Sequence, residues 1–437
     1  MRIKNNIICA CFTLMALIVG NVYASPEIQS WRTEQGAKVL FVQNKMLPMV
    51  DVRIVLDAAG SRDGELPGLA KLTNGLLAEG AAGKDAQELA ERFESVGAQF
   101  NNDSLRDMAF LGVRTLTDEQ YMLTAINTLA DVLIRPDFPQ DAFERELARM
   151  KVALEARKQS PSDIAEEAFF KAVYGEHPYA FPAGGTEQSL ESITLQDIEA
   201  FYAEYYVASN ATIVIVGAID RKTAEEIVIT TIGSLPAGKK PDPLPAVPEL
   251  AEAKTVKVDY PSKQSHVHVG QPGMKRNDKD FFKLYVANHP FGGSGFASRL
   301  VQTIREDRGL AYSVSSYFSP MRETGPFMMS LQTRTDQADK ALSLLQSELD
   351  TYVANGPDKD ELEESISNIT GSFPLGLDSN SKLLGFLAMI GFYDLPEDYL
   401  DTYIDNIRKV DRNDIKDVLK SRIAVDNMVT VIVGNGG

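Results

Sequence analysis

The sequence predicts an α+β protein made of two related halves. Segments with the apolar alternation of strands are interspersed with segments whose apolar residues recur every three to four positions, as in amphipathic helices. The order of these segments in residues 38–219 begins again after residue 254, and a proline-rich stretch separates the two series. A chain of 437 residues is also too long for one ordinary hydrophobic core, so two or more domains are expected.

The first 24 residues have the composition of a secretory signal peptide. Arg2 and Lys4 precede a mainly apolar run at residues 7–20, and Val22-Tyr23-Ala24 resembles a small-residue cleavage site. A transmembrane helix needs about 20 apolar residues, so we expect cleavage after Ala24 rather than a membrane span. The mature protein is then expected in the periplasm, with no membrane-spanning segment.

Both cysteines, Cys9 and Cys11, lie inside this segment. The mature protein would have no cysteine and no disulfide, which fits a bacterial periplasm better than a disulfide-stabilised extracellular domain. Lipidation remains an alternative, although Cys11 stands at the start of the apolar run and not after it.

The chain is strongly acidic. Its 44 basic and 61 acidic residues give a formal charge of −17. Without Arg2 and Lys4, 42 basic residues remain, and 42 − 61 gives −19 for the mature chain. Such a charge argues against nucleic acid and anionic membrane surfaces as partners. Solubility and attraction of basic peptides both remain open as explanations.

The pattern assigns most of the first half to alternating strands and helices. The predicted strands are 38–44, 50–60, 98–104, 106–116 and 211–219, and the predicted helices are 66–80, 85–96, 118–134, 141–157, 162–173 and 195–206. Gly97 ends the second helix. In the second half the same order starts with a strand at 266–270 and a helix around 281–289.

A repeat relates the two halves. A shift of 217 places lays Ile193–Gly217 on Val410–Gly434 without a gap, and both segments read as a helix, a polar turn with Asn, and a β-branched strand that ends in Gly. Between the halves, residues 236–253 contain several prolines and little periodicity, as an extended linker does. We therefore predict a signal peptide at 1–24, domains at 25–235 and 254–437, and this linker.

The stretch Leu66–Gly80 has the frame of a metal-binding helix without its ligands. In the inverted zinc-peptidase motif H-x-x-E-H, two histidines four apart hold Zn²⁺ and the Glu is the general base. Here the ligand positions are Lys71 and Gly75, and the base position is Asn74. An ammonium group and a hydrogen atom cannot hold Zn²⁺, and an amide cannot activate water. An ordinary amphipathic helix would explain the leucines equally well.

The surroundings of this helix resemble the M16 family of zinc metallopeptidases, the pitrilysin and mitochondrial-processing-peptidase group. The matching residues are the strand Val52–Leu56, the turn Gly60-Ser61-Arg62-Asp63 and Gly68-Leu69-Ala70. The resemblance implies two homologous α/β-sandwich domains, each a mixed, mostly antiparallel sheet with helices on one face. Smaller members of the family pair two such chains into a four-domain chamber.

A second match lies in the other half. The run Phe291–Leu300 leads into Val301–Val314, and resembles the family's C-terminal signature of a glycine turn, S-R-L and R-x6-Y. The resemblance maps the family's substrate-binding Arg and Tyr onto Arg305 and Tyr312. A guanidinium and a phenol supply the donors that a peptide carbonyl needs as it becomes an oxyanion. A surface Arg and a packed Tyr are the alternative.

Few residues are left to build a metal site. The four histidines are His177, His266, His268 and His289. His266 and His268 alternate on a strand and share a face, but they lack a third ligand. The resemblance places the family's third ligand, a Glu, near Glu146 and Glu155. One of them is a candidate ion-pair partner for Lys71, and a solvated helix face is the alternative.

Three functions remain open. In the first, the chain is catalytically silent, binds no metal itself, and pairs with an M16 paralogue that carries H-x-x-E-H and zinc. It then encloses half of a chamber for unfolded peptides and contributes Arg305 and Tyr312. In the second, it is a peptide-binding or chaperone-like protein without proteolysis. In the third, it is a metallopeptidase with a relocated metal site.

Overall fold

The computed structural model describes residues 26–434, so the predicted signal peptide lies outside the described residues. In the first half the strands are β1 (Gln29–Arg32), β2 (Lys38–Gln43), β3 (Met49–Leu56), β4 (Gly80–Ala81), β5 (Lys84–Asp85), β6 (Gln99–Ser104), β7 (Ala109–Leu116) and β8 (Ala211–Gly217). The helices are α2 (Leu69–Leu76), α3 (Ala86–Glu94), α4 (Glu119–Ile134), α5 (Gln140–Arg157), α6 (Pro161–Tyr174), α7 (Glu187–Ser192), α8 (Leu195–Tyr205) and α9 (Arg221–Ile232).

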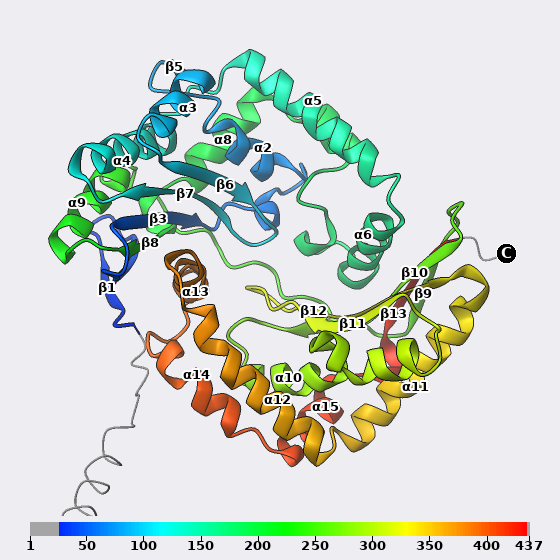
Figure 1. Ribbon diagram of the computed structural model, residues 1–437. Coiled ribbons are helices and arrows are strands. Elements are labelled where there is room, and N and C mark those ends of the chain that lie inside the picture. The colour runs from blue at the N-terminus through cyan, green and yellow to red at the C-terminus, as the bar shows by residue number, and fades with distance from the viewer. Residues whose placement is uncertain (1–25, 435–437) are drawn as a thin grey trace, which may run out of the picture.

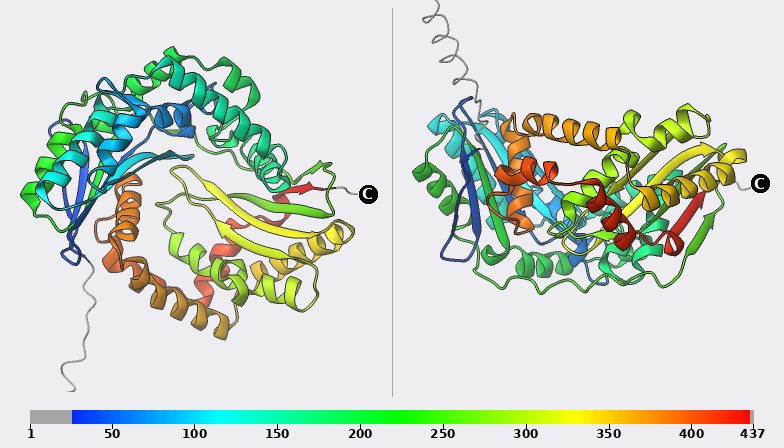
Figure 2. Two further views of the ribbon diagram at one scale, coloured as in Figure 1. Left: turned by 45° about the horizontal axis from the view of Figure 1, so that its top comes forward. Right: turned by 90° about the horizontal axis from the view of Figure 1, so that it is seen from below.

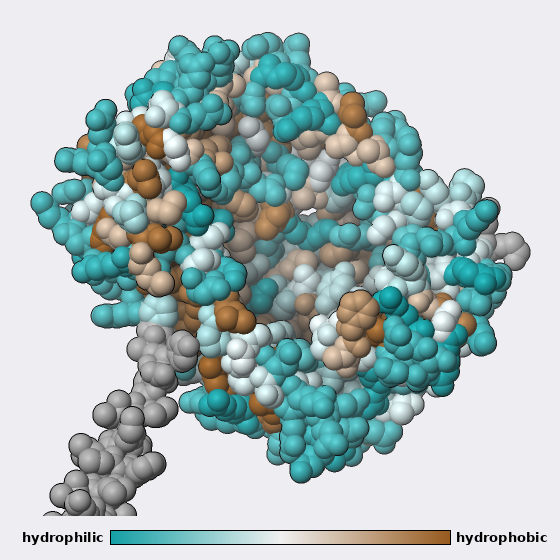
Figure 3. All heavy atoms as spheres, in the orientation of Figure 1, coloured by the Kyte–Doolittle hydropathy of each residue, from teal (hydrophilic) through white to brown (hydrophobic). Residues whose placement is uncertain are grey.

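The second half repeats the plan with fewer elements. Its strands are β9 (Lys254–Val258), β10 (Gln264–Met274), β11 (Ser313–Phe318), β12 (Gly325–Arg334) and β13 (Val429–Val433). Its helices are α10 (Phe281–Asn288), α11 (Ala338–Asn355), α12 (Lys359–Ser372), α13 (Asn380–Phe392), α14 (Tyr399–Arg408) and α15 (Arg412–Arg422). Figure 1 shows the two halves facing each other, and Figure 3 shows this face hollowed between them.

Sheet topology confirms the predicted fold of two related α+β halves. The first sheet runs β1-β2-β8-β3-β7-β6, and the second runs β9-β13-β10-β12-β11 when read from its opposite edge. If β1 is set aside, each strand has a counterpart. In both sheets the first pair in this order, β2 with β8 and β9 with β13, is parallel, and the remaining pairs are antiparallel.

A helix from the other half also packs against each sheet. This exchange of helices between the halves was not predicted from the sequence. On β8, Ile213 and Ile215 face the first half's own core, whereas Val214 and Val216 pack with residues of the second half. Helix α13 lies on this second face, over β3 and β8 (Figures 1 and 2). Helix α6 covers β10 and β13 in the same way. Burial on both faces explains why β8 is a continuous run of buried, mostly β-branched residues.

Residues 236–253 contain no helix or strand and run along both halves. Leu244 is buried against α6, and His177 Nε2 lies 2.9 Å from the carbonyl oxygen of Pro245. Arg62 of the first half donates to the carbonyl of Asp242 at 2.7 Å. The connection is therefore packed against the body of the protein. Within 26–434, no helix is both long and apolar enough to cross a membrane.

A buried carboxylate joins the two halves. Asp107 accepts hydrogen bonds from Tyr179 Oη at 2.5 Å, from the backbone N–H of Arg322 at 2.5 Å and from Tyr393 Oη at 3.2 Å. Arg322 and Tyr393 belong to the second half. Burial raises the pKa of Asp107, and the hydrogen bonds from these donors oppose that rise. We call Asp107 with these three partners the interdomain cluster.

His268 is expected to make the protein less stable in mild acid. Its ring is buried beside Phe169 of α6, at 6.2 Å between ring centroids. Burial lowers the pKa of His268 to about 4, from the ordinary 6.5. The unfolded chain therefore binds a proton between pH 6.5 and 4 that the folded chain does not. The contribution of His268 to the free energy of unfolding therefore falls as the pH drops through this window, by about 3 kcal/mol in full. Buried carboxyl groups whose pKa is raised, such as Asp107, contribute with the opposite sign.

Urea unfolding at pH 7 and pH 4.5 measures this effect. Between pH 7 and pH 4.5, the free energy of unfolding of His268→Leu should rise relative to that of the unaltered chain, because the titrating ring is gone. His266→Leu is the comparison on the same face. Its ring is only partly buried, and it contributes less than burial does to the lowered pKa of His268, so its effect should be smaller. An unchanged pH dependence in His268→Leu would assign the acid sensitivity to other groups.

Candidate functional site

Helix α2, which carries the zinc-peptidase frame, is fixed at its N-terminus by a buried carboxyl group. Asp63 accepts hydrogen bonds from the backbone N–H groups of Gly68 and Ala70, each at 2.7 Å. Burial raises the pKa of Asp63 to about 8, and the two donors oppose that rise. Gly68 has a φ of 97°, and a Cβ there would lie 2.9 Å from the Cα of Gly185. The turn and this glycine therefore set where α2 begins.

Lys71, at the first ligand position, forms an ion pair with the edge strand of the sheet. Its Nζ lies 3.1 Å from Oδ1 of Asp103 on β6, and both side chains are partly exposed. Next to it, Asn102 Nδ2 donates to the backbone carbonyl of Asn74 at 2.7 Å. Two contacts thus tie α2 to β6 on the side where the frame would hold a metal.

Asn74, at the position of the general base, is buried and serves as a hydrogen-bond donor. Its Nδ2 lies 3.3 Å from the carbonyl oxygen of Phe110 on β7 and 3.3 Å from Tyr206 Oη. At Gly75, the second ligand position, an added Cβ would meet nothing within 4 Å. The position therefore has room for a side chain, and glycine is not required by packing there.

Neither glutamate pairs with Lys71, so the ion-pair alternative is wrong, and Glu155 lies on a solvated helix face as the other alternative has it. Glu146 is buried and pairs with Arg149, and Glu155 is exposed and pairs with Lys158 at 2.8 Å. Neither lines the pocket beside α2. The residues of α5 that do so are Met150, Ala153, Leu154 and Arg157. Glu146 lies one helical turn before Met150, the first of these pocket-lining residues, so its side chain is not part of the pocket lining.

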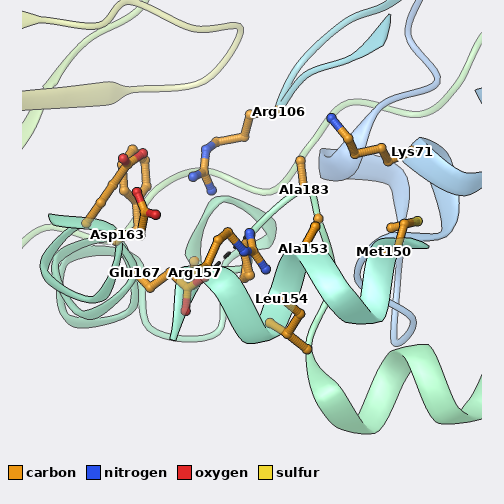
Figure 4. A pocket seen from close by; sticks show the side chains of 14 residues that line it. Lys71, Arg106, Met150, Ala153, Leu154, Arg157, Asp163, Glu167 and Ala183 are labelled. Atoms are coloured by element: carbon orange, nitrogen blue, oxygen red, sulfur yellow. Dashed lines mark ion pairs between the residues drawn. The ribbon is translucent and has the colours of Figure 1, made fainter. Parts of the chain in front are cut away.

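The pocket beside α2 has a volume of about 370 Å³ and carries both signs of charge (Figure 4). Lys71 and Met150 stand at one end of it, and Asp163 and Glu167 of α6 at the other. Arg157 lies 3.5 Å from Glu167 in an ion pair. Burial raises the pKa of Glu167, and Arg157 opposes that rise. Charged side chains thus line both ends of the pocket, with the carboxylates of α6 at the end away from the degenerate motif.

Restoring the motif alone is expected to leave the chain without tight zinc. The triple change Lys71→His, Asn74→Glu and Gly75→His supplies two histidines and a base, but no third ligand from α5. Adding Met150→Glu places a carboxylate on the stripe that faces the pocket. We expect about one zinc per chain only in this fourfold variant, since a catalytic zinc takes three protein ligands.

Metal content after dialysis measures this difference. The unaltered chain is expected to retain no stoichiometric zinc. Tight zinc in the triple variant that disappears with Glu146→Gln would show that Glu146 reaches the site after all, and would contradict the expectation.

Arg305 and Tyr312 lie on the second half, away from α2. Arg305 falls in a short π-helical segment, Val301–Glu306, and its Nε lies 3.5 Å from Glu306 Oε1. Tyr312 precedes β11, its backbone N–H donates to Gln332 at 2.8 Å, and its side chain is 72% exposed. Neither residue lines the pocket beside α2. The structure therefore does not bring the two predicted groups of site residues together within one pocket.

No metal centre is evident in the part of the chain that the structure describes. There, no three or more side chains of His, Cys, Asp or Glu are grouped so that they could hold an ion. His266 and His268 share a face of β10, as the alternation predicts, and that face packs against α6.

Asp103, the partner of Lys71, was not predicted from the sequence. Its signal was the polar run Gln99–Ser104, which marks β6 as an edge strand rather than a central one. A charged residue on such a strand is open to pairing from the neighbouring helix.

These features define a peptidase-like chain of two α+β repeats whose metal-binding helix has lost its ligands. A family model described as "Insulinase (Peptidase family M16)" matches residues 38–187, and one described as "Peptidase M16 inactive domain" matches residues 192–369. The chain belongs to the M16 family of peptidases.

Relatives with this architecture occur in several bacteria. The Helicobacter pylori protein named "Non-peptidase homolog YmxG" is 27% identical over 428 residues, 97% of this chain and 98% of that protein. The Bacillus subtilis "Uncharacterized zinc protease YmxG" is 27% identical over 359 residues, 82% and 86% of the two chains. A solved Pseudomonas fluorescens structure, described as a "peptidase M16 inactive domain", is 37% identical with a TM-score of 0.90, over 93% of this chain and 98% of that one.

Proposed function

We propose that this chain is the non-catalytic subunit of a periplasmic, heterodimeric M16 peptidase. Its partner is a paralogue that carries H-x-x-E-H and the zinc, and together they enclose unfolded peptides. This chain contributes Arg305 and Tyr312 to substrate binding across the chamber.

One observation carries the proposal. At the three positions of the zinc motif stand a lysine in an ion pair, a buried asparagine and a glycine, none of which can serve a metal site. On the other half, Arg305 and Tyr312 are present, and the side chain of Tyr312 is exposed. Loss of the metal chemistry together with retention of the carbonyl-binding pair suits a subunit that assists catalysis by another chain. The name of the Helicobacter pylori relative, a non-peptidase homolog, is in keeping with this function.

Co-purification from the native host tests the pairing. We expect the companion chain to contain H-x-x-E-H, the complex to hold the zinc of that companion, and chelation to stop its peptidase activity. The isolated mature chain should show neither zinc nor cleavage. Tight zinc with chelator-sensitive cleavage by the isolated chain would overturn the proposal and favour a relocated metal site.

Peptide binding without proteolysis is the second candidate, and the edge strand β6 favours it. The side chains of Gln99 and Asn101 are exposed, and β6 ends the sheet, so an extended peptide has backbone groups to pair with. A binding protein of this kind would need no companion. Peptide binding by the isolated chain, with no M16 paralogue recovered from the host, would support this function instead.

A further inference from the structure

An exposed aromatic ring stands in a fixed turn before the Arg305 segment. Phe296 is 77% exposed and follows Gly295, which has a φ of 62°. The carbonyl of Gly295 accepts hydrogen bonds from Ser298 Oγ at 2.7 Å and from the N–H of Ser298 at 3.0 Å. Ser298 itself is fully buried. Hydrogen bonds from the buried Ser298 therefore fix the turn, while the side chain of Phe296 projects into solvent.

The ring of Phe296 lies over the guanidinium of Arg305. The distance from Arg305 Cζ to the ring centroid is 5.0 Å, within the range of a cation–π contact. The contact restricts the side chain without using a hydrogen bond. Among the residues that the structure describes, only Nε of Arg305 lies near a carboxylate, at 3.5 Å from Glu306, so the other N–H donors are open to a carbonyl.

Without the ring, Arg305 has one near neighbour of opposite charge in the described structure. Glu306 lies 3.5 Å away and is about half exposed, so the pair is weakly held. A long arginine side chain has many rotamers, and binding a substrate through it costs the entropy of fixing them. A partner that holds the guanidinium beforehand reduces that cost.

We infer that Phe296 is a positioning residue, which holds the guanidinium of Arg305 in the orientation that binds the carbonyl of an extended peptide. The inference rests on the proposed function, because it takes the binding role of Arg305 as given. An exposed hydrophobic residue needs no function in general, and direct contact of Phe296 with the peptide or with the partner chain is the competing explanation.

A double-mutant cycle separates these explanations. The proteins are the unaltered chain, Phe296→Leu, Arg305→Ala and the combination, each assembled with the zinc-depleted partner chain and measured for affinity toward a fluorescent, unstructured peptide by anisotropy. We expect Phe296→Leu to weaken binding about two- to five-fold, as loss of an exposed cation–π contact does. The combination should bind no more weakly than Arg305→Ala alone, and Phe296→Trp should bind like the unaltered chain. Tyr121→Leu, at an exposed aromatic residue on α4, is the matched control and should change nothing.

Each other outcome is decisive. Equal weakening by Phe296→Leu with and without Arg305 would show that the ring contacts the ligand itself, and would overturn the inference. Unaltered affinity in Phe296→Leu beside weakened affinity in Arg305→Ala would also overturn it and leave the proposed function standing. Unaltered affinity in Arg305→Ala would instead remove the role of Arg305, and with it this part of the proposed function.

Discussion

Replacing Tyr312 by Phe is expected to lower the turnover of the reconstituted heterodimer by about 10²–10³-fold. The change keeps the ring and removes only the hydroxyl that would donate to the developing oxyanion. Since the side chain is 72% exposed, the loss of packing should be small. The measurement mixes the variant with the unaltered partner, confirms the dimer by size and its zinc by metal analysis, and then follows peptide cleavage with the complex in saturating amount.

Tyr317→Phe is the matched control for this prediction. Tyr317 lies on β11, is 39% exposed, and its hydroxyl has only the sulfur of Met328, at 3.9 Å, as a weak acceptor. We expect its turnover to stay within about two-fold of the unaltered complex, because loss of such a contact costs under ~1 kcal/mol. Full activity in both Tyr312→Phe and Arg305→Ala would mean that the pair is structural, and that the chain merely encloses the chamber.

Replacing Asp107 by Ala is expected to lower the free energy of unfolding by about 3 kcal/mol or more. The change leaves three donors of the interdomain cluster without their acceptor: the buried hydroxyl of Tyr179, and the partly buried hydroxyl of Tyr393 and N–H of Arg322. A fully buried donor left unpaired costs about 1–3 kcal/mol, and the other two add to it. Urea unfolding measures the loss, with the only tryptophan, Trp31, as the fluorescent probe.

Asp103→Ala provides the comparison, since it removes an aspartate from the partly exposed pair with Lys71. That change should cost under ~1 kcal/mol. A similarly small decrease in the free energy of unfolding in both variants would show that the interdomain cluster contributes little to the stability of the interface between the halves.

The fold could be predicted because the local patterns and the repeat agree. Strand alternation, helical spacing and the shift of 217 all indicate two α+β units, and the sheets have that matching order. The exchange of α6 and α13 could not be predicted. The apolar face of a helix predicts that the helix packs against another element, but it does not predict which of two similar sheets that element is.

The site was predictable only where chemistry depends on residue type. Lys71, Asn74 and Gly75 exclude the zinc motif by what they are, whatever their surroundings. The partner of Lys71 depends on how β6 lies against α2, a tertiary contact between residues 32 places apart. Glu146 does not pair with Lys71, and the pocket lining begins one helical turn later, at Met150. Residue spacing in the sequence cannot tell these two positions apart.

The exchanged helices have a consequence for how the chain is made. Strand β8 is complete at residue 217, but the helix that covers its second face ends at residue 392. At the 5–20 residues per second of ribosomal synthesis, α13 is completed on the order of ten to thirty seconds after β8. Val214, Val216 and their neighbours are open to misassembly during that interval. We therefore expect the first sheet to complete its packing only when nearly the last helix of the chain is available, whether the chain folds during synthesis or after export.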